Sequence, residues 1–475
     1  MKILIINPPI RLADKPRHIP HGLGILASLV RKKLGVVPTF LDINSKRYSD
    51  DQVRQKLEEV EFDVVLIGGL IPVYKRIVVY ADMIKSINPN VMIIAGGSAA
   101  MSVPELLLKN SKVDAVCLGE GEEAIVELFS NIRDGKGIES VKGFCFKKDG
   151  KIVNTGAPEL LGDLDAESDL PAYDLLQMDI YLSNPVVGFG RDIDFISSRG
   201  CPYQCTFCYQ PWGRKFRAHS AQFIVTAIAG LRERYGVDFI SFQDDEFMAD
   251  KRRVRAFCDL LTKTVPGMLW SCTGRVNCVD DEIVAIMRDA GCVSISYGFE
   301  SGSTRILKSM KKNVTIQQME NAIRVNRKYG MMLPVSFIIG MPGENDESCR
   351  ETVEFCVRNE LPLKSMMYAT PYPGTELFNY ALKTGRIRES QIHEFVIRLE
   401  DARDFVVNLT DDFTDEELMA KRSEMIEEVG SRVTPISVEE CDRRLQNLFG
   451  EIYSNGSVDS STSKHRAEHG GIDIF

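Results

Sequence analysis

Three cysteines stand within eight residues of one another in the stretch RGCPYQCTFCYQPWGRKFR, residues 199–217. Cys201, Cys205 and Cys208 follow the spacing C-x3-C-x2-C, and thiolates are soft ligands for iron–sulfur clusters or zinc. A structural zinc site needs a fourth protein ligand, for which His219 is the candidate, so this alternative stays open. Three cysteines on one loop can instead bind three irons of a [4Fe–4S] cluster, which leaves the fourth iron open to an exogenous ligand.

The elements that would position this loop form an alternating α/β pattern. Apolar runs predict strands at DIDFISS, DFISFQDD, LWSCTGR, VSISYGFE, LPVSFIIGMPG and LKSMMYATPYPG, and helical stretches separate them. Six such repeats within residues 191–385 predict a partial (β/α)6 barrel of the TIM type, which carries its chemistry at the carboxyl ends of the strands.

A second alternating pattern fills residues 1–150, where five strand–helix pairs predict a parallel sheet of the Rossmann or flavodoxin type. Several strands end in small or turn-forming residues, where an open parallel sheet binds its ligand. No GxGxxG follows the first strand, so a dinucleotide is not indicated. The strand-end residues are Asn7, Gly68, Gly69, Gly96, Gly97, Ser98, Gly119 and Glu120.

The remaining segments complete the predicted organisation. The stretch FCFKKDGKIVN predicts a β-hairpin with Asp149–Gly150 at its turn. We predict a linker over 151–190, a helical C-terminal region over 386–453 and a disordered polar tail over 454–475.

Composition narrows the class of protein. The chain has 475 residues, of which 44% are hydrophobic and 26% charged, with a net charge of −9, so bulk charge does not favour nucleic-acid binding. No apolar run reaches membrane-spanning length and the N-terminus lacks a signal peptide, which predicts a cytoplasmic protein with reduced cysteines.

The cysteine motif and its neighbours resemble the radical S-adenosylmethionine (radical SAM) superfamily over about residues 190–385. QDDEF (243–247), GFESGS (298–303) and IIGMPGE (338–344) fall where that family binds the methionine, ribose and adenine parts of SAM, and PYPGTEL matches a late motif of one subgroup. The resemblance implies SAM contacts, and Arg275 is added as a candidate anchor for the SAM carboxylate because arginine suits bidentate pairing. The implied SAM contacts are Phe207, Asp244, Asp245, Glu246, Glu300 and Gly340.

The N-terminal half resembles the cobalamin-binding domain that precedes the barrel in one radical SAM subclass. IPHGLGILASLVRKKLGVVPTFLDIN (19–44), which contains Gly22 and Gly24, matches its opening, and the strand-end residues above become the implied cobalamin contacts. This sequence has Ala99 and Met101 at the usual histidine and threonine places and lacks an Asp-x-His-x-x-Gly motif, so a histidine-ligated cobalt is unsupported.

The resemblance implies an enzyme that reductively cleaves SAM to a 5′-deoxyadenosyl radical and, with cobalamin, methylates an unactivated carbon. A small-molecule, lipid or tetrapyrrole substrate and an electron donor such as flavodoxin or ferredoxin are the implied partners. The alternatives are a radical-driven cyclase or ring rearrangement, an RNA-modifying methylthiotransferase, and a non-enzymatic cobalamin-sensing module with a structural metal site.

Overall fold

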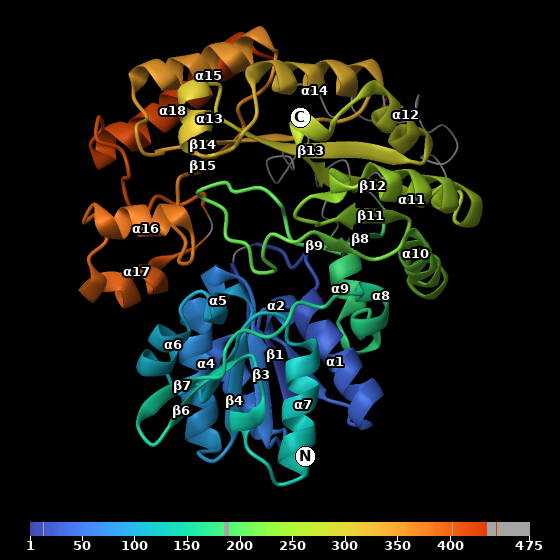
Figure 1. The fold of residues 1–475 in the computed structure, drawn as a ribbon, viewed down its shortest axis with the longest axis vertical. Helices are drawn as coiled ribbons and strands as arrows, with labels where there is room; N and C mark the ends of the chain where they lie inside the picture. The colour runs from blue at the N-terminus through green and yellow to red at the C-terminus, as the bar shows by residue number, and fades with distance from the viewer. Residues whose placement is uncertain (13, 185–189, 401, 435–442, 444–475) are drawn as a thin grey trace. The chain divides into compact units, whose positions relative to one another are not determined.

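The computed structural model describes residues 1–12, 14–184, 190–400, 402–434 and 443, and the predicted tail 454–475 lies outside them. The chain groups into two compact units. Unit 1 comprises Met1–Tyr181, Tyr209–Gly213 and Tyr372–Asp401, and unit 2 comprises Leu182–Cys208, Arg214–Pro371 and Ala402–Phe475. Each unit contains one large sheet (Figure 1).

Unit 1 is a seven-stranded sheet in the order β2-β1-β3-β4-β5-β6-β7, in which β2 to β5 run parallel and β6 and β7 form the predicted antiparallel hairpin. Its strands are β1 (Ile3–Asn7), β2 (Thr39–Asp42), β3 (Val64–Gly68), β4 (Met92–Gly96), β5 (Ala115–Cys117), β6 (Phe144–Lys148) and β7 (Lys151–Asn154). Its helices are α1 (His21–Leu34), α2 (Ile43–Lys46), α3 (Asp50–Glu58), α4 (Tyr74–Ile87), α5 (Ser98–Met101), α6 (Pro104–Asn110), α7 (Glu122–Arg133), α8 (Leu164–Glu167), α16 (Glu376–Lys383) and α17 (Ile392–Arg398), while α9 (Met178–Leu182) ends at the boundary with unit 2.

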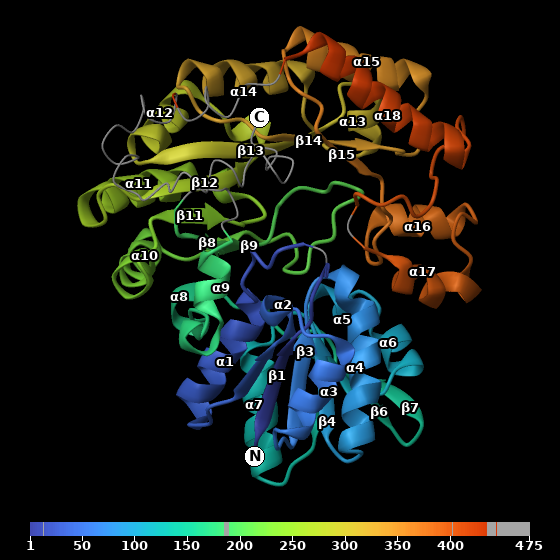
Figure 2. The ribbon, with the colours of Figure 1, turned by 180° about the vertical axis from the view of Figure 1, so that it is seen from behind.

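β1 and β3 are buried along their whole length, because helices cover both faces of this sheet. On one face, α1 and α7 pack through Ala27, Val30 and Leu128 against the strands (Figure 1). The reverse view shows α3 and α4 in front of the sheet, on its other face (Figure 2). The doubly wound fold predicted for the N-terminal half is confirmed.

Unit 2 contains a six-stranded parallel sheet in the order β15-β14-β13-β12-β11-β8. The strands are β8 (Asp192–Phe195), β11 (Phe239–Phe242), β12 (Leu269–Gly274), β13 (Cys292–Glu300), β14 (Val335–Ile339) and β15 (Ser365–Tyr368), with a short pair β9 (Ser198–Arg199) and β10 (Arg217–Ala218). The helices are α10 (Ala221–Tyr235), α11 (Lys251–Thr264), α12 (Asp281–Asp289), α13 (Thr304–Ser309), α14 (Ile316–Lys328), α15 (Asp346–Arg358) and α18 (Asp415–Arg432). Six parallel strands in sequential order confirm the predicted partial barrel.

The core of unit 2 is aromatic. The rings of Phe242, Phe257 and Trp270 meet edge to face, with centroids 5.3 to 5.8 Å apart. Such packing of large rings fixes the strands relative to the helices behind them and thereby gives the strand ends a rigid base.

The domain limits drawn from sequence stay a prediction, and the contacts group some segments differently. Residues 155–181 of the predicted linker pack within unit 1, where Ala172 N donates to Gly24 O at 3.0 Å. Residues 372–401 also pack within unit 1, where the rings of Tyr74 and His393 lie 5.9 Å apart. Sequence spacing carries no signal for such contacts, because they join residues far apart in the chain.

Candidate radical SAM and cobalamin sites

Two short strands, β9 and β10, pair with each other at the two ends of the cysteine loop and so close it. β9 and β10 pair antiparallel, with Arg217 opposite Arg199 and Ala218 opposite Ser198. Within the loop, Thr206 N donates to Met310 O at 2.9 Å. The loop follows β8 directly, so the three cysteines lie at the carboxyl end of the first barrel strand, as predicted.

Burial disfavours the ionisation of two of the three thiols, those of Cys201 and Cys208. The pKa of Cys208 is raised to about 12 by desolvation and then by the nearby sulfur of Cys205, and desolvation also raises the pKa of Cys201. Bound iron would offset this cost of ionising buried thiols, so the donor set fits a cationic cluster. In the part of the chain that the structure describes, no three His, Cys, Asp or Glu side chains are already arranged to hold a metal. Binding of one cluster by the three cysteines therefore stays a prediction.

His219, the fourth ligand of the zinc alternative, is buried against other groups. Its ring stacks on Phe223 with centroids 4.0 Å apart, and its backbone N donates to Ser197 O at 2.9 Å. These contacts give His219 a packing role at the start of α10.

Arg275 places a guanidinium beside the cysteine loop. Its Nη1 lies 3.8 Å from Cys205 Sγ, and its guanidinium carbon lies 3.7 Å from the centre of the Tyr203 ring. The residue is only 6% exposed, yet its Nε and Nη2 have no hydrogen-bond partner among the described residues. Because buried donors require acceptors, this site fits an anionic ligand such as the SAM carboxylate.

Glu246 and Asp245 follow β11 and have perturbed acidities. Glu246 is buried and accepts a hydrogen bond from Met248 N at 3.2 Å. Desolvation raises its pKa to about 7, against the opposing effects of Arg275 and Lys312. The pKa of Asp245 rises to about 6 through desolvation and the charge of Asp244.

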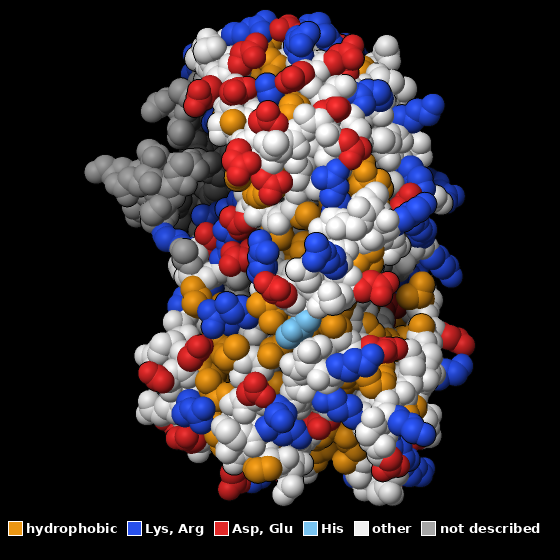
Figure 3. All heavy atoms as spheres, turned by 90° about the vertical axis from the view of Figure 1, so that its left-hand side faces the viewer, with side chains coloured by type: hydrophobic (Ala, Val, Ile, Leu, Met, Phe, Trp, Pro, Cys, Tyr) orange, Lys and Arg blue, Asp and Glu red, His pale blue; other side chains and the backbone are white. Residues whose placement is uncertain are grey.

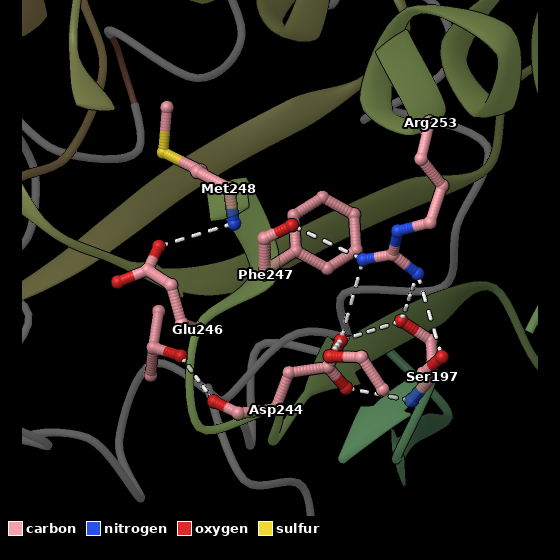
Figure 4. A network of polar contacts seen from close by, with 8 residues as sticks. Ser197, Asp244, Glu246, Phe247, Met248 and Arg253 are labelled. Atoms are coloured by element: carbon pink, nitrogen blue, oxygen red, sulfur yellow. Dashed lines mark hydrogen bonds and ion pairs between the residues drawn. The ribbon is translucent and has the colours of Figure 1, made fainter. Parts of the chain in front are cut away.

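Asp244 differs from the other predicted SAM contacts, because its side chain is fully engaged inside the protein (Figure 4). It accepts from Ser197 N at 2.6 Å, Ser197 Oγ at 2.5 Å and Ser198 Oγ at 2.7 Å. Arg253 Nη2 lies 3.6 Å from the same carboxylate. The Asp244 side chain therefore anchors the start of the cysteine loop, and the predicted contact of Asp244 with SAM stays a prediction.

Glu300 ends β13 in a left-handed backbone conformation, with φ of 67°, beside a shift in strand register. Lys312 Nζ lies 2.8 Å from Glu300 Oε1 and 5.9 Å from the centre of the Phe207 ring. Phe207 therefore lies near the carboxylate predicted to bind ribose. Non-glycine residues with positive φ cluster at functional sites, which agrees with the role predicted for Glu300. Sequence reasoning missed Lys312, because nothing in the local pattern distinguishes it from its neighbour Lys311.

The glycine-rich turn after β14 is held by a buried acid. Gly340 has φ of 92° and donates its N–H to Glu344 Oε2 at 2.6 Å, and Met341 N donates to the same oxygen at 3.2 Å. A β-carbon at Gly340 would meet Leu418 Cδ2 at 3.1 Å. Glycine is therefore required here by conformation and space, and Glu344 fixes the turn predicted to border adenine.

In unit 1, glycines at the carboxyl ends of β3 and β4 pack backbone against backbone. A β-carbon at Gly68 would lie 2.6 Å from Gly96 O, and one at Gly97 would lie 2.6 Å from Gly69 O. At Gly96, by contrast, a β-carbon would meet only Cys117 Cβ at 3.9 Å. Gly96 would thus tolerate a β-carbon, whereas Gly68 and Gly97 are required for packing.

Some of the other predicted cobalamin contacts bond to or pack against protein groups, and Gly22 has open space beside it. Asn7 Nδ2 donates to Asp42 Oδ1 at 2.8 Å, and Leu161 N donates to Glu120 Oε2 at 2.8 Å. Gly24 lies against Pro171, and Gly119 lies against Pro158. Gly22 has open space where a β-carbon would stand, and Ser98 begins α5.

A six-stranded partial barrel with a three-cysteine loop after its first strand, in a chain that also carries a doubly wound sheet, defines the class of radical SAM enzymes with a cobalamin-binding domain. Residues 195–356 match the Radical SAM superfamily, and residues 10–129 match the B12 binding domain. The chain belongs to the branch of the radical SAM superfamily that carries a B12-binding domain, and it is an enzyme. The cofactors of this branch are a [4Fe–4S] cluster, SAM and cobalamin.

Relatives support this assignment. An uncharacterised methyltransferase of Pyrococcus horikoshii is 32% identical over 389 residues, covering 80% of this chain and 83% of that protein. The anaerobic magnesium-protoporphyrin IX monomethyl ester cyclase of Rubrivivax gelatinosus is 27% identical, over 71% of this chain and 62% of that protein. The fold is that of the radical SAM methyltransferase TsrM from Kitasatospora setae, with a TM-score of 0.73 at 15% identity over 96% of this chain and 99% of that one.

Two further observations concern the charged side chains on the surface and the apolar character of the helices. On the face drawn in Figure 3, acidic and basic side chains are interspersed. Among the described residues, none of the helices is both long and apolar enough to span a membrane.

Proposed function

We propose that this enzyme is a cobalamin-dependent radical SAM methyltransferase that methylates a carbon atom of a small-molecule, lipid or tetrapyrrole substrate. The observation that carries the proposal is that two nitrogens of the Arg275 guanidinium, Nε and Nη2, lack a partner among the described residues beside Cys205, because buried donors next to a cluster loop suit a ligand that completes the cluster. The similarity to a methyltransferase over four-fifths of the chain favours methyl transfer.

The residues have separate proposed roles. Cys201, Cys205 and Cys208 would hold three irons, and Arg275 would pair with the SAM carboxylate. Glu246 would accept a hydrogen bond from the SAM amino group and Glu300 one from the ribose, while Phe207 and the turn at Gly340 would border adenine. When bound, the reduced cluster supplies the electron that cleaves SAM, and cobalamin serves as the methyl carrier.

The carboxyl edge of the sheet in unit 1 would bind cobalamin. The glycines there have no side chain to hold a large ligand away from the backbone. As a radical SAM enzyme, the protein requires a reductant, for which we propose flavodoxin or ferredoxin.

The test is anaerobic reconstitution with iron, sulfide and cobalamin, followed by reaction with methyl-labelled SAM and candidate substrates of the three classes. Label in the product supports methyl transfer. A ring-closed product without label instead supports the cyclase chemistry of the Rubrivivax relative, and labelled methylated product formed without bound cobalamin rejects cobalamin dependence.

A further inference from the structure

The aromatic ring of Tyr203 covers the guanidinium of Arg275. The guanidinium carbon lies over the ring at 3.7 Å from its centre, which is van der Waals contact. Tyr203 stands inside the cysteine loop, between Cys201 and Cys205, and Arg275 directly follows β12. The contact therefore joins the cysteine loop to the carboxyl end of another strand of the same barrel.

The ring leaves the edge of the guanidinium available for hydrogen bonds. Arg275 Nη1 lies 3.8 Å from Cys205 Sγ, whereas Nε and Nη2 are buried and have no hydrogen-bond partner among the described residues. In a guanidinium the N–H of Nε and one N–H of Nη2 point in the same direction, so these two atoms form a pair that suits both oxygens of one carboxylate. A stacked ring occupies only the face of the group and does not compete for this pair.

Tyr203 is itself fixed by hydrogen bonds at its backbone and at its hydroxyl. Arg214 Nη1 donates to Tyr203 O at 2.9 Å, and Asn277 Nδ2 donates to Tyr203 Oη at 3.1 Å. Cys278 Sγ lies 3.7 Å from the same hydroxyl oxygen. A ring held at both ends restricts the rotation of the arginine side chain that packs on it.

We infer that Tyr203 is a positioning residue, whose ring holds Arg275 so that Nε and Nη2 together pair with the carboxylate of SAM. The inference rests on the proposed pairing of Arg275 with SAM and adds a residue to which that proposal gives no role. An arginine that is already ordered loses less conformational entropy when its ligand binds, so the ligand binds more tightly. The attraction between a cation and an aromatic face is strongest where water is excluded, as at this buried guanidinium.

The experiment measures SAM binding by the full chain after anaerobic reconstitution of its cluster. The readouts are calorimetry and the change that SAM causes in the electron paramagnetic resonance (EPR) spectrum of the reduced cluster. Tyr203→Leu removes the ring, and we expect normal iron content with a dissociation constant for SAM about tenfold higher. Tyr203→Phe keeps the ring and should retain most of the affinity.

The matched control is Tyr329→Leu, which should leave SAM binding unchanged. Tyr329 also places its ring beside an arginine, with the guanidinium carbon of Arg288 at 5.5 Å from the ring centre. It lies between α14 and β14, at the amino end of that strand, whereas the cysteine loop follows the carboxyl end of β8.

Two further measurements connect the effect to Arg275 and to the carboxylate. Decarboxylated SAM lacks the group that Arg275 would bind, so Tyr203→Leu and the wild type should bind it equally. In a chain that already carries Arg275→Met, the addition of Tyr203→Leu should not weaken SAM binding further, because the two residues act on one ligand group as a unit. Additive losses in the double variant would overturn the inference.

The outcomes separate the inference from the function on which it rests. Wild-type protein that does not bind SAM, or Arg275→Met protein that binds SAM normally, rejects the proposed pairing of Arg275 with SAM. Weak binding by Arg275→Met together with normal binding by Tyr203→Leu overturns the role of Tyr203 alone. If Tyr203→Leu loses its cluster, Tyr203→Met, which has a longer apolar side chain, decides. Loss of the cluster in both variants would overturn the inference, because the ring would then support the loop itself.

Discussion

Lys312 Nζ lies 2.8 Å from Glu300 Oε1, and the two side chains are only 10% and 8% exposed. The ion pair joins the end of β13 to the loop that follows α13. Burial makes the pair sensitive to the loss of either partner, because the remaining charge then lacks both water and a counter-ion.

Replacing Lys312 with methionine should therefore weaken both stability and SAM binding. We expect the free energy of unfolding to fall by about 3 kcal/mol and the dissociation constant for SAM to rise, as measured by chemical denaturation and calorimetry. Lys312→Arg should retain most of the stability and most of the affinity for SAM. Lys308→Met, which changes an exposed lysine on α13, is the control, and a Lys312→Met protein that matches it would contradict the prediction.

Alanine at Cys201, Cys205 or Cys208 should remove the cluster. Each change deletes a thiolate ligand, so iron and sulfide content and the EPR signal of the reduced cluster should be lost. Cys258→Ala changes a buried cysteine on α11 and should retain both. Full iron content in all three variants would show that the cluster is held elsewhere.

Glu344 should make the stability of the protein fall with rising pH. Burial raises the pKa of its carboxyl from 4.5 to about 7. Between these pH values the unfolded chain releases a proton that the folded protein keeps, so the contribution of Glu344 to stability is complete below about pH 4.5 and is lost as the pH rises to about 7.

Glu344→Gln removes this titration. The difference in free energy of unfolding between variant and wild type should shift in favour of the variant by up to about 3 kcal/mol between pH 5 and pH 8, as measured by denaturation at both values. Glu347→Gln, at an exposed acid on α15, should show no such shift. A constant difference for Glu344→Gln would mean that the carboxyl titrates normally.

Two neighbouring glycines should respond differently to alanine. Gly68→Ala places a methyl group 2.6 Å from Gly96 O and should destabilise unit 1 by about 1–3 kcal/mol. Gly96→Ala has space and should fold normally, yet it should weaken cobalamin binding if the ligand occupies that space. Thermal unfolding and absorbance titration with hydroxocobalamin measure the two effects, and normal cobalamin affinity in Gly96→Ala would exclude close approach there.

The sequence was most informative where local pattern determines structure. Each of the six barrel strands is a short apolar run followed by a helical repeat, and the hairpin turn at Asp149–Gly150 has positive φ at both residues. The position of the cysteine loop in the fold could be predicted because an apolar run that predicts the first barrel strand immediately precedes it. These signals require only neighbours along the chain.

Long-range contacts could not be predicted in the same way. The sequence gives Asp244, Asp245 and Glu246 equal standing as acids after a strand, and only the structure turns Asp244 towards Ser197 and Arg253. Lys312 becomes important through its distance from Glu300, which depends on the path of the chain through α13. Burial, which separates these residues by pKa and role, is a property of the assembled barrel.

The grouping of the chain into its two units has a consequence for protein engineering. The polypeptide passes between the units five times, and the last stretch assigned to unit 1, Tyr372–Asp401, follows the final barrel strand. A gene fragment that stops at Tyr181 would therefore omit α17, whose His393 packs on Tyr74. Swapping the N-terminal half between homologues as a cassette would require the matching C-terminal stretch to be exchanged with it.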